Sequence, residues 1–325
     1  MRRTNRRLAR SVVFFVFLAL LAFNLPATAQ DQERPTFSAS VAVVPITALV
    51  RDSKNRIVRG LERADFQVLE QGQPRPIVDF RSKEDASVSV AFLFDTSGSM
   101  RVASNLEKGL WFIDQFLGNL APAGDEAALF TFHKTLRQEV EFTGDRERIR
   151  GALGRVNPWG LTSLYDAVAE TAKQLASRPA PRRALVVISD GVDTSSSLTP
   201  QQVSALASSI DVPVYVIAVV SPLDRPDRPG SPANEAAAQV NGNLADLANW
   251  TGGELIYVSV SDQTNAATRD LLATMRQQYF LAIESASAPG WYALEVKTKR
   301  RGLSVKSRRG YFADSVASGA AKDDR

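Results

Sequence analysis

The segment FLFDTSGSM, residues 92–100, joins a run of apolar residues directly to one carboxylate and three hydroxyl side chains. An uninterrupted apolar run of this kind predicts a strand that is buried on both faces. Asp95, Ser97 and Ser99 follow at once, so we expect them in the loop at the carboxyl end of that strand. Gly98 lies between the two serines, and we expect it to allow a tight bend that turns both hydroxyls inward.

Strand-like and helix-like segments alternate on the C-terminal side of this loop. Apolar runs that predict buried strands occur at 87–94, 127–133, 184–190, 212–220 and 254–259. Helical spacing occurs at 106–120, 163–177, 200–209, 243–250 and 264–277. The segment 135–142 alternates in polarity and predicts an antiparallel edge strand. This order predicts an α/β fold with a doubly wound, mainly parallel, Rossmann-like sheet.

The two flanks of this region are rich in β-strand patterns instead. Predicted strands lie at 40–50, 66–70, 76–80, 279–285, 291–298 and 303–312. Neither flank is long enough to bury a core alone. We therefore expect both to form one smaller β-sandwich-like domain into which the α/β domain is inserted; the alternative is two separate appendages on the α/β sheet.

Residues 1–29 have the features of a bacterial signal peptide. Five arginines precede the apolar run 12–23, and small residues lead to an expected cleavage before Gln30. The run is shorter than the roughly 20 residues of a spanning helix. We expect an exported protein, periplasmic or secreted, with no membrane span after cleavage; a retained anchor is the alternative.

Together these patterns divide the chain into five parts. They are a signal peptide (1–29), an N-terminal β segment (30–84), the α/β domain (85–278), a C-terminal β segment that packs with 30–84 (279–314), and a disordered tail (315–325).

Charge and cysteine content exclude several classes of function. The net charge of +4 comes from those five arginines, because the rest of the chain has 34 basic against 35 acidic residues. We therefore expect no nucleic-acid partner. The chain has no cysteine, which excludes disulfides, thiolate metal sites and a cysteine nucleophile.

Two further segments bring polar residues to the loop at Asp95. Loops at the carboxyl ends of strands form the site of a doubly wound sheet, at the point where strand order reverses. Asp190 ends the apolar run 184–190, and Thr162 opens the helix before it. Singly, these residues have structural interpretations, as an Asx-type turn, a helix cap and an ordinary turn. Together they predict one crevice.

The five side chains of that crevice all offer hard oxygen atoms. They are Asp95, Ser97, Ser99, Thr162 and Asp190. Such a set suits Mg²⁺, with Mn²⁺ or Ca²⁺ as alternatives, better than zinc or copper. Two carboxylates balance a divalent charge and leave coordination positions open for water or for an oxygen of a partner.

The three separated pieces D-T-S-G-S, G-x-T-x-L and I-S-D-G resemble the metal-ion-dependent adhesion site of von Willebrand factor A (VWA) domains. The resemblance covers about residues 85–278. It implies that Ser97, Ser99 and Thr162 are metal ligands, some depending on state, and that Asp95 and Asp190 act directly or through water. The patterns V-x-D-x-x-N-R-x-V-x-G-L-x-x-x-D-F (50–66) and R-x-G-Y (308–311) resemble a secreted bacterial group, the VWFA-related Acidobacterial domain proteins. The resemblance implies no enzymatic activity.

The favoured hypothesis is a binding module without catalytic residues, in which a carboxylate of a protein partner completes the metal coordination. The loops around the site, including 221–235, would then select the partner. The alternative is a metal-assisted or serine hydrolase that uses His133, the only histidine in the chain. Phosphate binding at the Ser/Gly loop is a third possibility, which the two carboxylates disfavour.

Overall fold

The computed structural model describes residues 43–82, 86–178, 182–191, 193–209, 211–219, 235–258 and 261–313. The predicted signal peptide 1–29, the predicted tail 315–325 and most of the loop 221–235 lie outside these residues. Among the described residues, no helix combines the length and apolar character that crossing a membrane requires.

A six-stranded sheet with the order β10-β9-β8-β5-β6-β7 forms the centre of the α/β region. Its strands are β5 (Val88–Asp95), β6 (Glu126–Phe132), β7 (Leu136–Thr143), β8 (Arg182–Ser189), β9 (Val214–Val219) and β10 (Leu255–Val258). All neighbouring pairs are parallel except β6 and β7, which are antiparallel. The predicted mainly parallel sheet with 135–142 as an antiparallel edge is confirmed.

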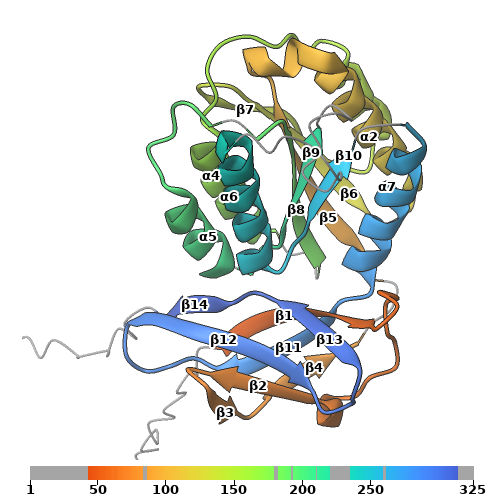
Figure 1. Cartoon of the computed structure of the whole chain (residues 1–325). Helices are drawn as coiled ribbons and strands as arrows, with labels where there is room; N and C mark the ends of the chain where they lie inside the picture. Colours follow the sequence, from red (N-terminus) through yellow and green to blue (C-terminus); the bar gives the residue numbers. More distant parts are fainter. Residues whose placement is uncertain are drawn as a thin grey trace, which may run out of the picture. The chain divides into compact units, whose positions relative to one another are not determined.

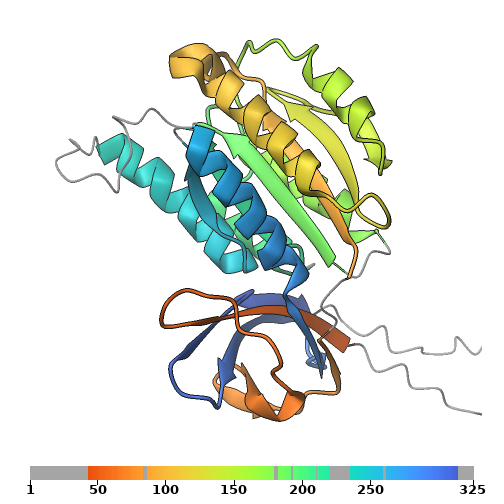
Figure 2. The same cartoon turned by 90° about the vertical axis from the view of Figure 1, so that its right-hand side faces the viewer.

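Helices cover both faces of this sheet (Figures 1 and 2). One face packs against α2 (Asn105–Asn119), α3 (Arg146–Leu153) and α7 (Ser261–Arg276). The other packs against α4 (Leu164–Ala176), α5 (Pro200–Ser209) and α6 (Glu235–Thr251). The apolar stripe of α2 buries Phe112, Ile113 and Phe116 against the sheet. Because both faces are covered, the inner strands β5, β6, β8 and β9 are apolar along most of their length.

Strand β5 lies where the strand order reverses, between β6 on one side and β8 on the other. Its Phe92, Leu93 and Phe94 are fully buried. Phe94 pairs with Ile188 of β8, so the carboxyl ends of β5 and β8 lie side by side. This is the place where sheets of this kind form their sites.

The two flanks form a pair of antiparallel four-stranded sheets, ordered β13-β1-β11-β4 and β14-β12-β2-β3. Their elements are β1 (Val43–Asp52), the 3₁₀ turn η1 (Arg63–Asp65), β2 (Phe66–Glu70), β3 (Gln73–Arg75), β4 (Asp79–Arg81), β11 (Tyr279–Glu284), β12 (Gly290–Thr298), β13 (Leu303–Ser307) and β14 (Gly310–Ala313). Both flanks contribute to one core, in which Ile46 and Val68 pack with Leu281 and Val296. The expected inserted arrangement is confirmed.

Two of the predicted flanking strands are wrong in detail. The prediction 76–80 is replaced by β3 and β4, because Gln71 and Gly72 have positive φ angles of 50° and 78° and form a tight hairpin turn from which β3 starts at once. The prediction 303–312 is two strands, β13 and β14, in different sheets. The break falls at Arg308, whose buried guanidinium donates to Ser208 O at 2.6 Å and to Pro45 O.

Candidate metal centre

The carboxylate of Asp95 connects the loop after β5 to the neighbouring strand. Its Oδ1 accepts a hydrogen bond from Ser97 N at 2.8 Å, and its Oδ2 accepts one from Ser189 Oγ at 2.6 Å. Ser189 Oγ in turn accepts from Gly191 N at 2.9 Å. Gly191 has a φ of 90°, a conformation that glycine adopts without strain, and this directs its N–H toward Ser189.

The environment of Asp95 makes its negative charge costly in the absence of a cation. The side chain has no solvent exposure. Burial raises the pKa of Asp95 to about 6, and the nearby carboxylate of Asp190 acts in the same direction. The hydrogen bonds from Ser189 and Ser97 partly oppose this rise in pKa. A buried carboxylate that faces a second carboxylate is stabilised by a cation between or beside them.

The two serine hydroxyls of the loop converge on one point. Ser97 Oγ and Ser99 Oγ are 3.0 Å apart. Ser97 has an extended backbone and directly precedes the 3₁₀ helix η2 (Gly98–Ser104), whose first turn brings Ser99 back toward it. The expectation for Gly98 is wrong: its φ is not positive, and an added Cβ would meet Gly160 O at an ordinary 3.6 Å. The start of η2 produces the bend with a backbone conformation that other residues also adopt.

The loop that carries Thr162 is attached to the loop after β5 by backbone hydrogen bonds. Gly98 N donates to Gly160 O at 3.1 Å, and Trp159 N donates to Thr96 O at 2.8 Å. Thr162 itself is buried. These bonds place Thr162 on the segment that borders Ser97 and Ser99, as the crevice prediction requires.

A polar segment after β8, residues 193–196, holds the Thr162 loop from its other side. Thr162 N donates to Thr194 Oγ1 at 2.9 Å, and Thr162 O accepts from Thr194 N at 2.9 Å. Asp193 Oδ1 accepts from Leu164 N at 2.8 Å and so caps the start of α4. Ser163, at the N-cap position, makes no side-chain capping bond. Sequence reasoning missed Asp193, although an aspartate in a Ser/Thr-rich loop is a general signal for capping.

Asp190 follows the last residue of β8 and is half-buried. Since β5 and β8 are adjacent and parallel, its position next to the end of β5 is fixed by the sheet register. The structure therefore joins Asp95 to Ser97 and Ser97 to Ser99 by hydrogen bonds, couples Asp190 to Asp95 electrostatically, and attaches the Thr162 loop to the loop after β5. Their assignment as metal ligands remains a prediction.

The residues present fit a small, hard divalent cation. Neighbouring ligands of an octahedral Mg²⁺ at about 2.0–2.1 Å lie about 2.8–3.0 Å apart, and the two serine oxygens are 3.0 Å apart. The flexible, often seven-coordinate geometry of Ca²⁺, with bonds of about 2.3–2.6 Å, also accommodates this separation. Among the described residues, no three His, Cys, Asp or Glu side chains are grouped as a metal site. A centre here therefore depends on hydroxyl oxygens as well as carboxylates.

The segment that runs from β5 to the middle of α5 matches a known protein family. Residues 90–205 match the family model of the von Willebrand factor type A domain. This segment is a VWA domain. All five predicted ligands lie within the matched part of the VWA domain, while β9, α6, β10 and α7 complete its sheet and helical layers outside the match.

Solved structures similar to this chain were found, whereas comparison with curated proteins found no match. An aerotolerance-related membrane protein from Bacteroides fragilis is 22% identical with a TM-score of 0.47, over 58% of this chain and 98% of that one. The vWF domain of the type V pili tip protein Mfa5 from Porphyromonas gingivalis is 12% identical with a TM-score of 0.44, over 58% and 96%. Proximal thread matrix protein 1 from the mussel byssus, with a zinc-occupied MIDAS motif, is 16% identical with a TM-score of 0.47, over 63% and 49%.

His133, the residue of the alternative hydrolase hypothesis, follows the end of β6. Its Nδ1 accepts a hydrogen bond from Lys134 N at 2.6 Å, and its ring lies 5.1 Å from the ring of Trp159. The imidazole thus bonds to its own loop and lies beside an aromatic ring, and no serine among the residues that the structure describes hydrogen-bonds to it as a base would to activate a nucleophile. This geometry does not favour the hydrolase hypothesis.

Proposed function

We propose that this protein is an exported, non-enzymatic binding module that engages a protein partner through a divalent cation held by its VWA domain. The cation would be bound by Asp95, Ser97, Ser99, Thr162 and Asp190. Mg²⁺ is the preferred ion, with Mn²⁺ or Ca²⁺ as alternatives. The observation that carries the proposal is the convergence of the Ser97 and Ser99 hydroxyls, 3.0 Å apart, beside the buried Asp95 carboxylate.

The chemistry of the site favours a carboxylate as the partner's contribution. Three of the five proposed ligands are neutral hydroxyls, which donate less charge than carboxylates, so the cation would retain affinity for a further carboxylate oxygen. The bound cation would supply an open coordination position that accepts a further hard oxygen, and a partner aspartate or glutamate offers one with a negative charge. The protein residues hold and orient the cation and exclude water from Asp95. None of these roles requires a proton transfer.

The surface around the site supports recognition of a protein. Val102 and Leu161 are exposed by 63% and 54%, and Trp159 by 63%. Val102 lies on η2, and Trp159 and Leu161 lie on the loop that carries Thr162. Large apolar side chains that stay exposed on ligand-bearing loops are typical of a contact surface for another protein.

The test combines metal binding with partner capture. Isothermal titration should show Mg²⁺ binding to wild type and none to Asp95→Ala. A pull-down from envelope extract of the host should retain a partner in Mg²⁺ and release it in EDTA. Asp246→Ala, which removes an exposed carboxylate on α6, is the matched control and should behave as wild type. Capture that is equal in wild type and Asp95→Ala, or equal with and without EDTA, contradicts the proposal.

Export rests on residues 1–29 and has its own test. The mature protein recovered from the host should begin at Gln30 and should fractionate with the periplasm or the medium. A full-length protein that still begins at Met1 and sediments with membranes would show a retained anchor instead.

A further inference from the structure

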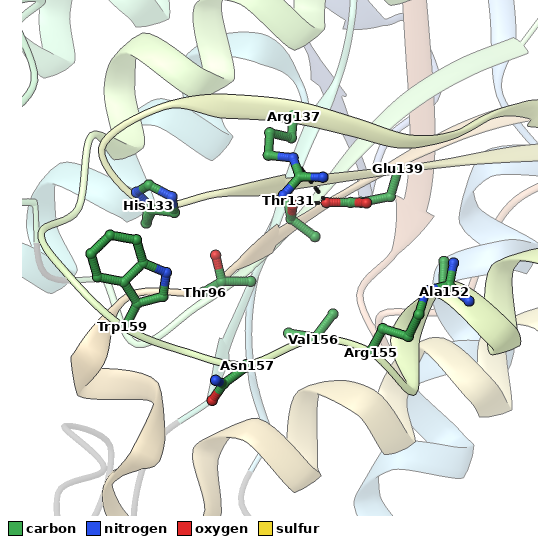
Figure 3. A pocket seen from close by; sticks show the side chains of 10 residues that line it. All are labelled: Thr96, Thr131, His133, Arg137, Glu139, Ala152, Arg155, Val156, Asn157 and Trp159. Carbon is green, nitrogen blue, oxygen red and sulfur yellow. Dashed lines mark hydrogen bonds and ion pairs between the residues drawn. The ribbon is translucent and has the colours of Figure 1, made fainter.

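A cavity of about 380 Å³ lies beside the proposed metal site, and none of the five proposed metal ligands lines it. Figure 3 shows the side chains around it. The residues that matter here are Thr96, His133, Arg137, Glu139, Arg155 and Trp159. Its volume is within the range of about 300–1,000 Å³ that is usual for ligand pockets. It is therefore large enough to receive a side chain of a partner with its flanking backbone.

The cavity is continuous with the metal-site loop. Thr96 stands between Asp95 and Ser97 in the chain, and successive Cα atoms are about 3.8 Å apart. Its Oγ1 donates to Phe132 O at 2.8 Å, and its carbonyl accepts from Trp159 N at 2.8 Å. A partner segment bound at the metal site would therefore reach the cavity with a residue one or two positions further along its own chain.

Basic groups predominate over acidic ones in the cavity lining. Two arginines, Arg137 and Arg155, and one carboxylate, Glu139, line it, and Figure 3 shows Arg137 beside Glu139 and the guanidinium of Arg155 apart from them, near Ala152. Glu139 Oε1 accepts from Thr131 Oγ1 at 2.9 Å and lies 3.5 Å from Arg137 Nε, so this carboxylate is already engaged. Glu139 and Arg137 balance each other, which leaves the guanidinium of Arg155 as the uncompensated charge.

The guanidinium of Arg155 has donors to offer to a ligand. Its Nη1 donates to Gly151 O at 2.9 Å, and the described residues include no carboxylate paired with it. A guanidinium has five N–H donors in a fork that matches a carboxylate. Across the cavity, His133 and Trp159 form an aromatic wall with their rings 5.1 Å apart. That wall can contact the backbone and the neighbouring residue of a partner segment while Arg155 binds the carboxylate of its acidic side chain.

We propose that this cavity is a second anchor point, which binds an acidic side chain of the same partner that supplies a carboxylate to the metal. The inference rests on the proposed function for the partner's first carboxylate, but the cavity and its charge do not depend on the metal. The partner's binding segment would then carry two acidic residues close in sequence. The metal would hold one and Arg155 the other, and linking the two contacts would strengthen both.

His133 provides a reporter inside the cavity because it is the only histidine in the chain. The full chain, labelled with isotopes in histidine, is titrated by NMR at low ionic strength, where such contacts are least screened. The probes are the peptide acetyl-Gly-Asp-Gly-Asp-Gly-amide and its neutral counterpart acetyl-Gly-Asn-Gly-Asn-Gly-amide. In EDTA the acidic peptide should shift the His133 ring signals saturably, and the neutral peptide should not. In Mg²⁺ the acidic peptide should bind more tightly.

Variants assign the effect to Arg155. Arg155→Gln should weaken binding of the acidic peptide in EDTA about tenfold or more. Arg148→Gln removes an exposed arginine of α3 outside the cavity and should leave binding unchanged. Equal binding of the two peptides, or equal affinity of Arg155→Gln and wild type, would overturn the inference.

The two proposals fail in different ways. Peptide binding that depends on Mg²⁺ and leaves the His133 signals unmoved would remove the second anchor and keep the metal site. His133 shifts in EDTA that Mg²⁺ does not strengthen, together with no metal binding by calorimetry, would keep the cavity as an anion pocket and remove the proposed function.

Discussion

Replacing Asp95 by asparagine should stabilise the metal-free protein and at the same time abolish its metal binding. The carboxylate has no solvent exposure, lies near Asp190, and has its pKa raised to about 6 by burial. At neutral pH the folded protein without metal must therefore hold a buried negative charge that the unfolded chain would hydrate. Asparagine has nearly the same shape and removes that charge.

The magnitude follows from the pKa. The interval between the ordinary value of 3.8 and about 6 corresponds to about 3 kcal/mol of lost stability at pH 7, since one pKa unit is worth about 1.4 kcal/mol. Because the folded-state pKa is the higher one, the folded protein binds the proton more tightly than the unfolded chain. The destabilisation is thus full above about pH 6 and disappears as the pH falls below 3.8.

The hydrogen bonds of Asp95 survive the replacement in large part. The amide oxygen can still accept from Ser97 N, and the amide N–H can donate to Ser189 Oγ, which has lone pairs for this donor and for Gly191 N. The hydrogen bonds of the asparagine will be less well aligned than those of the carboxylate, so the gain in stability falls below the limit of about 3 kcal/mol. We expect Asp95→Asn to be more stable than wild type by about 1–3 kcal/mol at pH 7 and by less than about 0.5 kcal/mol at pH 4.

Urea unfolding in EDTA, at a series of pH values from 4 to 7.5, measures this difference. Other carboxylates titrate in both proteins, so the difference between the two curves isolates Asp95. Asp246→Asn, at an exposed position on α6, should track wild type at every pH. Excess Mg²⁺ should stabilise wild type by mass action and leave Asp95→Asn unchanged. An Asp95→Asn protein less stable than wild type at pH 7, or a gain that does not shrink on acidification, would refute this reasoning.

Asp193→Ala should destabilise the protein by about 1–2 kcal/mol through loss of the cap on α4, and should weaken Mg²⁺ binding because the cap also holds the Thr162 loop. Urea unfolding measures the stability and calorimetry measures the metal affinity. A loss of stability with unchanged metal affinity would show that the cap does not support metal binding. Gly109→Ala should cost about 1–2 kcal/mol, because its Cβ would lie 2.7 Å from the Phe94 ring. Gly118→Ala, on the same helix with nothing within 4 Å, should instead gain up to about 1 kcal/mol, and thermal unfolding that ranks the two alike would contradict this packing.

The sheet and the loop after β5 could be predicted from the sequence because their signals are local. Continuous apolar runs mark strands covered on both faces, and the rule for strand-order reversal places Asp190 beside Asp95 without any knowledge of contacts. The structure confirms that β5 and β8 are neighbours. The shared sandwich was predictable from size alone, because neither flank could bury a core by itself.

The parts that sequence reasoning missed depend on distant partners or on weak patterns. Helix α3 has only eight residues, and its buried Ile149, Ala152 and Leu153 form an apolar stripe of little more than one turn among charged neighbours. Its start could have been found, because Asp145 accepts from two backbone N–H groups of the first turn. The split between β13 and β14 depends on acceptors that Arg308 finds a hundred or more residues away.

The pairing of the two flanks sets an order for events during synthesis. Ile46 of β1 pairs with Leu281 of β11, and Val68 of β2 pairs with Val296 of β12. At roughly 5–20 residues per second, the first strand leaves the ribosome on the order of ten seconds or more before its neighbour exists. The VWA domain is complete before that time, so it folds while the earlier strands still have unpaired edges. Premature termination after α7 but before the C-terminal strands are complete would therefore release a folded VWA domain with exposed strand edges, a species prone to edge-to-edge association.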